Sequence, residues 1–418
     1  MQTPTIFEAM LKWFVIISML ALSCKSNEQK VRAQYINNLR QMPAGEIKVL
    51  GDSIGYFMDT LLNNTGFSGG ILVAKNGTVL YEHYQGFSDV AQSTPINDST
   101  PFHVASTSKT FTSTAILQLL QQGKISLSDS LEQIFPGFPY KGITIKHLLS
   151  HISGLQNYAY FFPKFGWDKK RIATNTDVLD FMISKKPPLT HPVGSKFEYC
   201  NTNFVLLALI VEKISGQTFP DYAKEKIFLP AGMKNTFVFG INDTARYLPS
   251  FKANKKIYSF DYLDAIYGDK NVYTTCRDLM QYDTAIRGHI FLDSATHEMA
   301  WQPQQPDHHY RDSSEFYGLG WRLKIWPGGN KIVYHNGWWH GNNSIFQRLY
   351  QDTAVIIITG NVFNRRIYHA PHIANIFKPY YEDINYQREV NEADSTGTRK
   401  TKVPVKKVKP IVKTKKRK

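Results

Sequence analysis

Hydrophobic and polar positions divide the chain into strand-rich ends and a helical middle. Two short apolar runs, Gly70–Ala74 and Thr78–Tyr81, flank a Lys-Asn-Gly turn and predict a β-hairpin. Apolar residues at three- and four-residue spacing predict a helix over Thr107–Gln122, and an unbroken apolar run predicts a buried helix over Asn203–Ser215. Further strands are predicted at 319–326, 331–334, 344–349 and 353–359. Both ends of the chain should therefore complete one α/β layer, with a helical lobe between them.

Composition narrows the class of protein. The chain has 418 residues, of which 42% are hydrophobic and 13% aromatic, so a wholly disordered chain is excluded. Three cysteines are too few for a disulfide-rich scaffold, a zinc ribbon or an iron–sulfur cluster. Cys200 and Cys276 are expected to be small buried residues rather than nucleophiles or a disulfide.

The net charge of +15 suggests an anionic partner, but the charge is concentrated at one end. Residues Arg399–Lys418 contain eleven Lys and Arg and no acidic residue, so removing them leaves +4 for the rest of the chain. The segment 381–418 is therefore predicted to be a polar, then polybasic, disordered tail. It could attach the protein to an anionic lipid or wall polymer, or serve only as a solubilising tail. Binding of nucleic acid is unlikely for an exported protein.

The first residues have the pattern of an export signal. Trp13–Leu22 is an apolar run of ten residues after Lys12, which suits a signal peptide and is too short to span a bilayer. The run ends at Ala-Leu-Ser followed by Cys24, which resembles a bacterial lipobox, although an ordinary signal peptide is the alternative. We expect residues 1–24 to be the signal and residues 25–47 to be a polar tether from a lipidated Cys24. The main domain should occupy residues 48–380.

The predicted first helix carries a candidate nucleophile. Ser106 and Lys109 are three residues apart, so their side chains share one face of a helix. An amine beside a serine hydroxyl can accept its proton and activate it for attack on a carbonyl. The helix N-terminus adds positive potential where an oxyanion would form. This spacing of two common residue types is a weak signal by itself.

Two further segments contain polar residues suited to the same chemistry. Tyr199 and Asn201 directly precede the buried helix. A tyrosine beside an ammonium group could ionise and act as a general base, and an amide could orient a substrate carbonyl. His335, Gly337 and Trp338 lie at the end of a predicted strand, where the glycine would allow close approach of a substrate and the Trp338 N–H could stabilise an oxyanion. A surface turn and a structural histidine are the alternatives.

These segments and several others occur in the order found in one known family. The segment Thr100–Thr112 resembles the active-site segment of the serine β-lactamase-related family, which includes class C β-lactamases, D-Ala-D-Ala carboxypeptidases, penicillin-binding protein-like hydrolases, D-aminopeptidases and esterases. Each motif is weak, but their ordered conjunction over about residues 65–362 is specific. The other matching segments are Gly123–Asp129, Ile143–Leu155, Phe197–Asn201, Tyr273–Leu279, Tyr317–Trp321 and His335–Gly337.

The resemblance implies a β-lactamase/transpeptidase-like fold, a mainly antiparallel sheet with flanking helices and an all-helical lobe, with the site between them. It also implies that Ser106 forms an acyl-enzyme and that Lys109 and Tyr199 share the proton transfers. Asn201 would position the substrate, and the backbone amides of Ser106 and Trp338 would form the oxyanion hole. His335 occupies the position where many β-lactamases carry lysine, which argues against efficient β-lactamase activity.

The sequence thus predicts an exported serine hydrolase of the bacterial cell envelope, on the periplasmic side, acting on an amide, peptide or ester bond. A D-Ala-D-Ala carboxypeptidase-like or related peptidase is favoured. The alternatives are a promiscuous esterase, a weak β-lactamase, or a catalytically silent protein that binds the cell wall. No cofactor is expected. His147 and His151 have metal-ligand spacing on a helix face, but no acidic residue lies between them, so no metal site is expected.

Overall fold

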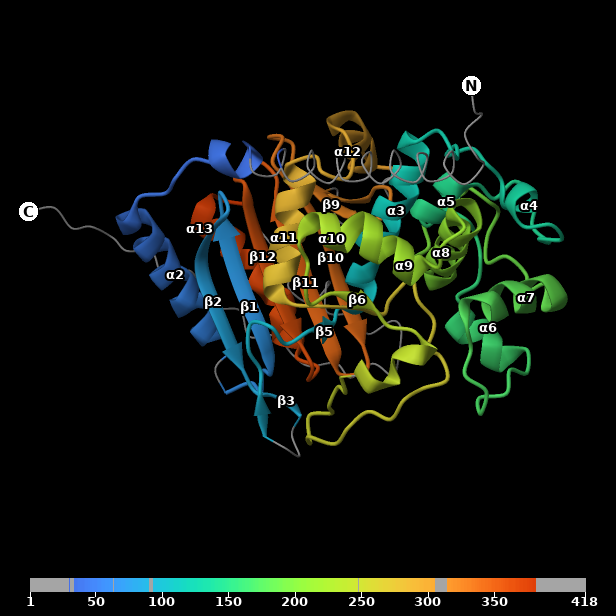
Figure 1. Ribbon diagram of the computed structural model, residues 1–418, viewed down its shortest axis with the longest axis horizontal. Helices are drawn as coiled ribbons and strands as arrows, with labels where there is room; N and C mark the ends of the chain where they lie inside the picture. Colours follow the sequence, from blue (N-terminus) through green and yellow to red (C-terminus); the bar gives the residue numbers. More distant parts are fainter. Residues whose placement is uncertain are drawn as a thin grey trace, which may run out of the picture. The chain divides into compact units, whose positions relative to one another are not determined.

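A seven-stranded antiparallel sheet organises the chain (Figure 1). The computed structural model describes residues 30, 34–62, 64–89, 93–246, 248–304 and 314–380. The expected signal with Cys24 and the tail 381–418 lie outside these residues. The strand order in the sheet is β2-β1-β12-β11-β10-β9-β8. The strands are β1 (Gly69–Lys75), β2 (Thr78–Gln85), β8 (Glu315–Tyr317), β9 (Arg322–Ile325), β10 (Lys331–Trp339), β11 (Asn342–Leu349) and β12 (Ala354–Gly360).

Both ends of the folded chain meet in this sheet, as the sequence predicts. The hairpin β1–β2 turns at Asn76 and Gly77, whose φ angles of 49° and 73° are left-handed. Two such residues are what a two-residue hairpin needs to match the twist of its strands. The first strand then pairs with the last, with Leu72 opposite Ile357. This pairing joins two chain segments almost 300 residues apart as neighbouring strands of one sheet.

Two small sheets accompany the large one, and their short strands have no counterpart in the sequence prediction. The first joins β3 (Phe87–Asp89) to β4 (Thr94–Pro95). The second has the order β5-β7-β6, formed by Phe102–His103, Val272–Thr274 and Phe237–Val238. In this sheet Phe102 pairs with Thr274, just before the turn that carries Ser106. The sheet therefore positions the candidate nucleophile.

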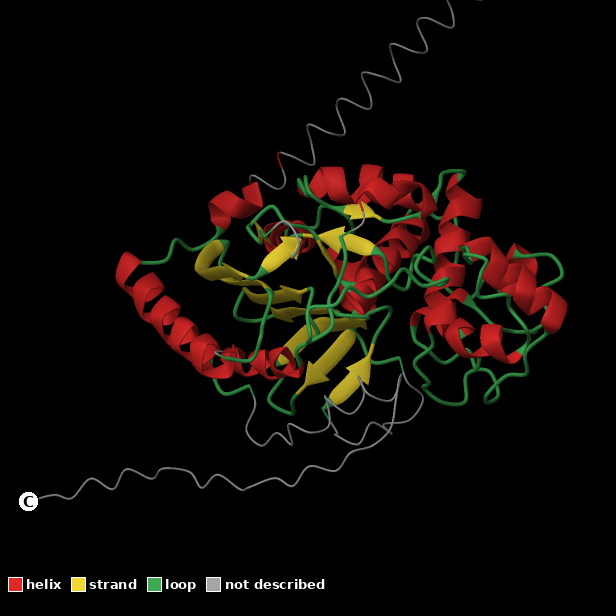
Figure 2. Cartoon of the chain, turned by 90° about the horizontal axis from the view of Figure 1, so that it is seen from below, coloured by secondary structure: helices red, strands yellow, loops and turns green. Residues whose placement is uncertain are grey.

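Helices and turns, without a further strand, fill the described chain between β5 and β6 and form the predicted helical lobe (Figure 1). Helix α11 contacts β1 and β12, and α2 packs on β2 and on the 3₁₀ segment Arg365–Ile373. Figure 2 shows helices on both faces of the sheet. The helices are α2 (Ala44–Leu62), α3 (Lys109–Gln121), α4 (Leu131–Ile134), α5 (Ile145–Leu149), α6 (Tyr158–Lys164), α7 (Asn175–Lys185), α8 (Asn201–Ser215), α9 (Phe219–Ala223), α10 (Leu229–Ala231), α11 (Cys276–Arg287), α12 (Ser294–Ala300) and α13 (Ala374–Phe377).

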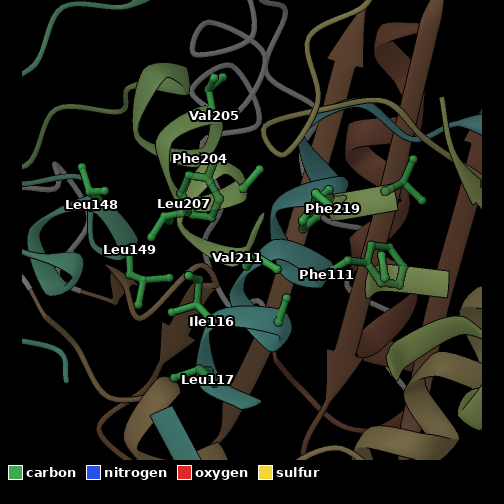
Figure 3. Packing of buried hydrophobic residues seen from close by; sticks show 14 of the residues in the cluster. Phe111, Ile116, Leu117, Leu148, Leu149, Phe204, Val205, Leu207, Val211 and Phe219 are labelled. Carbon is green, nitrogen blue, oxygen red and sulfur yellow. The ribbon is translucent and has the colours of Figure 1, made fainter. Parts of the chain in front are cut away.

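The two helices predicted from periodicity form the centre of the core. Helix α8 is buried along nearly its whole length and ends at Gly216, whose φ of 73° provides the left-handed C-cap. It packs against α3, and Figure 3 shows Phe111 of α3 and Phe204 of α8 in the same cluster. Burying one such phenylalanine contributes about 1.5–3 kcal/mol. The core therefore holds both helices in fixed positions at the site described below.

The N-terminal segment differs in part from the tether expected over residues 25–47. Helix α2 already begins at Ala44. Before it, the Leu39 side chain lies against Gly77 of the hairpin turn, and Tyr35 lies against Gly288. These contacts place part of the expected tether on the folded domain. No helix among the described residues is both long enough and apolar enough to cross a bilayer.

Candidate active site

Ser106 and Lys109 meet at the start of α3. Ser106 lies in a 3₁₀ turn, Ala105–Ser108, that directly precedes the helix, and Ala105 has a left-handed φ of 47°. The Lys109 Nζ donates to the Ser106 Oγ at 3.0 Å and to the backbone carbonyl of Asp269 at 2.8 Å. Ser106 is partly exposed whereas Lys109 is fully buried. A reactant can therefore reach the hydroxyl while the amine stays shielded from water.

Burial changes the acid–base behaviour of Lys109. Removal from water disfavours the charged amine and lowers the pKa of Lys109 to about 7. The nearby Arg322 guanidinium lowers this pKa further, while the Asp269 carboxylate opposes the shift. Near neutral pH a substantial share of the lysine is therefore uncharged. In that form it can accept the proton of Ser106.

Tyr199 lies beside this pair, immediately before α8. The Lys109 Nζ is 5.0 Å from the centre of its ring, and the Arg322 guanidinium carbon is 5.3 Å from it. Burial raises the pKa of Tyr199 above its usual value, although Arg322 and the neighbouring Ser106 hydroxyl both act to lower it. The tyrosine hydroxyl is buried and makes no hydrogen bond of ordinary geometry among the described residues.

The direction of the Tyr199 shift corrects the expectation that this tyrosine ionises. Proximity to an ammonium group favours the phenolate, but burial lowers the pKa of Lys109 toward neutral pH and the site is desolvated. Burial therefore dominates, and the phenol keeps its proton at neutral pH. Tyr199 is then suited to donate a proton, and Lys109 is suited to accept one.

Strand β10 forms the opposite side of the site. Its pairing with β9 ends at Tyr334, so His335–Trp339 has a partner strand only on the β11 side among the described residues. A Cβ on Gly337 would lie 2.1 Å from the carbonyl oxygen of Val104, which is two residues before Ser106. The glycine thus allows β10 to approach the Ser106 turn, a different reason from the close substrate approach expected from the sequence. Trp338 follows it and is partly exposed.

His335 is buried at the start of this open half-strand. Its Nδ1 lies 2.8 Å from the carbonyl oxygen of Asn336, and its Nε2 lies 3.1 Å from the Tyr317 hydroxyl. Burial, together with the positive charges of Arg322 and Lys109, lowers the pKa of His335 well below its usual value. The imidazole is therefore neutral, and both of its nitrogens are engaged.

Two buried amide oxygens at the site lack hydrogen-bond partners among the described residues. They belong to Asn201, the first residue of α8, and to Asn336 of β10. An unsatisfied buried polar atom costs about 1–3 kcal/mol. Such a cost is typical of a site whose polar groups are completed by a substrate. Cys200, by contrast, is a free buried thiol, as expected, and burial raises its pKa to about 11.

Sequence reasoning missed four contributors to the site. Asp269 supplies a backbone carbonyl, which leaves no signal in the residue type. Arg322 follows a segment that was recognised only as part of the family pattern, and Tyr317 lies inside that segment. His151 lies inside the matching segment Ile143–Leu155 and was otherwise weighed only as a metal ligand, a role that was not expected. No group of three or more His, Cys, Asp or Glu side chains suited to a metal occurs among the described residues.

Comparisons with known proteins identify the family of this chain. The family model described as "Beta-lactamase" matches residues 57–376. Penicillin-binding protein 4* of Bacillus subtilis is 33% identical over 320 residues, covering 72% of this chain and 70% of the relative. This chain belongs to the beta-lactamase family. It is a serine hydrolase by that membership, as the sequence resemblance predicted.

One further relative and two solved structures show how far the similarity reaches in sequence and in fold. A D-aminopeptidase of Brucella anthropi is 32% identical over 183 residues, but the match covers only 44% of this chain and 34% of that protein. The crystal structure of a penicillin-binding protein from Bacillus halodurans superposes with a TM-score of 0.66 at 25% identity, covering 78% of this chain and 99% of that one. A D-amino acid amidase from Ochrobactrum anthropi gives a TM-score of 0.64 at 21% identity and therefore supports the fold alone. The predicted β-lactamase/transpeptidase-like fold is confirmed.

Proposed function

We propose that the protein hydrolyses an amide or peptide bond through an acyl-enzyme on Ser106, acting as a D-Ala-D-Ala carboxypeptidase-like or related peptidase. The observation that supports this most is the 3.0 Å hydrogen bond between the Ser106 Oγ and a buried lysine whose pKa is about 7. A lysine with an ordinary pKa near 10.4 would be almost wholly charged at neutral pH and could not accept the serine proton.

The proton transfers follow from the protonation states of the site. Neutral Lys109 accepts the Ser106 proton as the serine oxygen bonds to the substrate carbonyl carbon. The Ser106 and Trp338 backbone N–H groups are proposed to stabilise the resulting oxyanion. The proton then passes from Lys109 through the Tyr199 hydroxyl to the leaving nitrogen as the C–N bond breaks. Water attacks the acyl-enzyme with Lys109 again as base, releasing the acid and restoring Ser106.

The substrate class is inferred from what similar proteins are known as and from the charges of the site. Penicillin-binding proteins and a D-aminopeptidase are among the similar proteins, which favours peptides or amides of D-amino acids. His335 is neutral, so it does not supply the cation that lysine provides at this position in many β-lactamases. This favours peptidase chemistry over efficient β-lactam hydrolysis. Permanent positive charge at the site comes from Arg322 instead.

The first experiment is intact-protein mass spectrometry after incubation with benzylpenicillin and, separately, with a fluorophosphonate. Wild type should gain one adduct, Ser106→Ala should gain none, and the exposed-serine control Ser128→Ala should behave as wild type. Labelling by both reagents supports a peptidase of the penicillin-binding type. Labelling by fluorophosphonate alone would favour the second candidate, an esterase. No adduct from either reagent would reject the hydrolase proposal in favour of a silent wall-binding protein.

Hydrolysis assays then separate the substrate classes. The full-length protein should release D-alanine from a peptide ending in D-Ala-D-Ala, or ammonia from D-phenylalanine amide, faster than from the matching L-compounds. If the protein hydrolyses p-nitrophenyl acetate but cleaves the D- and L-peptides at equal rates, the esterase is favoured. Rapid turnover of a chromogenic cephalosporin would contradict the argument from His335. Each reaction should disappear in Ser106→Ala.

Export and anchoring are proposed separately from the chemistry. We propose that the protein reaches the periplasmic side of the bacterial envelope, carries lipid on Cys24 and contacts an anionic surface through Arg399–Lys418. Bacterial penicillin-binding proteins among the relatives are consistent with an envelope location. Cys24→Ser should abolish labelling with a fatty-acid analogue, and deletion of residues 399–418 should reduce envelope retention while leaving hydrolysis unchanged. Equal retention of the truncated protein would reject the role of the tail.

A further inference from the structure

We propose that His151 is a positioning residue for Tyr199, and that it starts a hydrogen-bond relay through Tyr317 that holds His335 in a single neutral tautomer. This inference rests on the proposed proton transfers at Ser106 and adds residues that those transfers do not name. His151 lies two residues beyond the end of α5, and its side chain is fully buried.

His151 contacts three consecutive residues of the segment that carries the tyrosine. Its backbone carbonyl accepts from the Glu198 N–H at 2.8 Å, and its Nδ1 accepts from the Cys200 N–H at 3.1 Å. Its ring centre lies 4.3 Å from the centre of the Tyr199 ring between those two contacts. His151 therefore binds the backbone N–H of the residue on each side of Tyr199 and packs against the tyrosine ring itself.

The backbone of His151 supports a role beyond filling space. Its φ of 58° is left-handed, a conformation that costs a residue with a Cβ about 1–2 kcal/mol. Glycine would adopt it without that cost. A histidine in this conformation, with both nitrogens bonded, is consistent with a site that tolerates strain to hold a geometry.

The direction of every hydrogen bond in the relay follows from its two ends. Because the His151 Nδ1 accepts from a backbone N–H, a neutral His151 carries its proton on Nε2. That nitrogen is 3.2 Å from the Tyr317 oxygen and donates to it. The Tyr317 hydroxyl then donates to the His335 Nε2 at 3.1 Å. The remaining His335 proton lies on Nδ1, which donates to the Asn336 carbonyl at 2.8 Å.

The groups around His335 favour the same neutral state. Arg322 of β9 and Lys109 of α3 carry positive charge toward it, and His151 and Tyr317 reach it through the relay. The Tyr199 ring lies 6.3 Å from the His335 ring. Charging His335 would require a proton on Nε2, where Tyr317 already donates. The relay thus joins the helical lobe to β10 and keeps His335 from becoming the cation of the site.

A kinetic experiment on the full-length protein tests the positioning role. Three variants are compared with wild type. His151→Phe keeps an aromatic ring but has no ring nitrogen, and Tyr317→Phe breaks only the relay. His151→Asn can still accept from the Cys200 N–H and tolerates the left-handed φ. The control is His147→Gln, four residues earlier on α5, where the histidine caps its own helix through Thr144. The assays are the rate of Ser106 labelling by a fluorophosphonate and kcat and KM for p-nitrophenyl acetate.

The expected result is a loss of about 10- to 100-fold in kcat for His151→Phe with little change in KM, since misplacing a reacting group by about 1 Å has effects of this size. His151→Asn should recover part of that loss, and His147→Gln should match wild type. If folded His151→Phe has the kcat of wild type and only its urea unfolding midpoint is lower, His151 merely stabilises the fold and the positioning role is overturned. Failure of wild type to react at Ser106 would instead reject the proposed function and this role together.

A spectroscopic measurement tests the relay without using activity. In protein labelled with ¹⁵N-histidine, long-range ¹H–¹⁵N correlations at pH 7 should show His151 protonated only on Nε2 and His335 only on Nδ1. Tyr317→Phe should shift the His335 Nε2 resonance and leave the Nδ1 proton in place. The opposite tautomer at either residue, or a doubly protonated His335, would overturn the relay even if the protein proves to be inactive. Assignments come from His151→Asn and from a His335→Gln variant.

Discussion

Removing the charge of Arg322 should move the pH dependence of Ser106 acylation upward by about one unit. Neutral Lys109 is the proposed base, so the rate should rise with pH through its pKa of about 7. The Arg322 charge helps to keep that pKa low. The lysine nitrogen and the guanidinium carbon lie 5.0 Å and 5.3 Å from the same ring centre and are therefore at most about 10 Å apart. At an effective dielectric constant of about 20 their repulsion is at least about 1.7 kcal/mol, or about one pKa unit.

The assay is the rate of Ser106 labelling by an uncharged fluorophosphonate from pH 5.5 to 9.5, with Arg322→Gln compared with wild type. The reagent has no carboxylate, so loss of a substrate contact does not enter the comparison. At pH 6 the variant should react about tenfold more slowly relative to its own plateau, because about tenfold less of its lysine is neutral. Lys48→Gln, an exposed charge on α2, should leave the midpoint in place. A wild-type rate that still rises steeply with pH up to 9.5 would refute a base with a pKa of about 7, and an unmoved midpoint in Arg322→Gln would refute the electrostatic argument.

Three further predictions concern stability. Between pH 7 and about 10, Lys109 keeps its proton in the unfolded chain but has lost it in the folded protein. The free energy of unfolding should therefore rise by up to about 1.4 kcal/mol per pH unit. Urea titrations of Lys109→Met should lack this rise. Gly337→Ala should lower stability by about 1–3 kcal/mol and abolish labelling, because its Cβ meets the Val104 carbonyl; normal labelling would contradict that contact. Asp283→Asn should cost about 3–5 kcal/mol in urea melts by leaving the buried Arg348 unpaired, with an unshifted pH midpoint of labelling.

The elements that were predicted correctly depend on local signals. The hairpin follows from Asn76 and Gly77, which adopt the left-handed angles of a tight turn. Helix α8 follows from the apolar run Phe204–Val211 and from Gly216, which ends the helix, and the contact of Ser106 with Lys109 follows from their spacing. Each of these signals lies within a few residues of its consequence. Such patterns can be recognised without knowing the fold.

The features that were missed depend on residues far apart in the chain. The β5-β7-β6 sheet contains strands of two or three residues, which are too short for a periodic pattern. The sequence allowed Tyr199 to ionise, whereas burial raises its pKa, and burial depends on chain segments that only the fold brings together. The backbone carbonyl of Asp269 that fixes Lys109 has no signature in its side chain. These quantities are defined only when the chain has folded.

The site combines a rigid part with a part that must be aligned with it. Ser106 and β10 are packed as one unit, since Ser344 of the neighbouring strand donates to the Val104 carbonyl at 2.7 Å and Gly337 leaves no space between them. A substrate that pairs with the open edge of β10 is thereby placed at a fixed distance from the nucleophile. Tyr199 comes from the helical lobe and has no such covalent or strand connection to β10. Its alignment therefore depends on the contacts made by His151, which explains why a residue remote from the reacting bond should affect kcat more than KM.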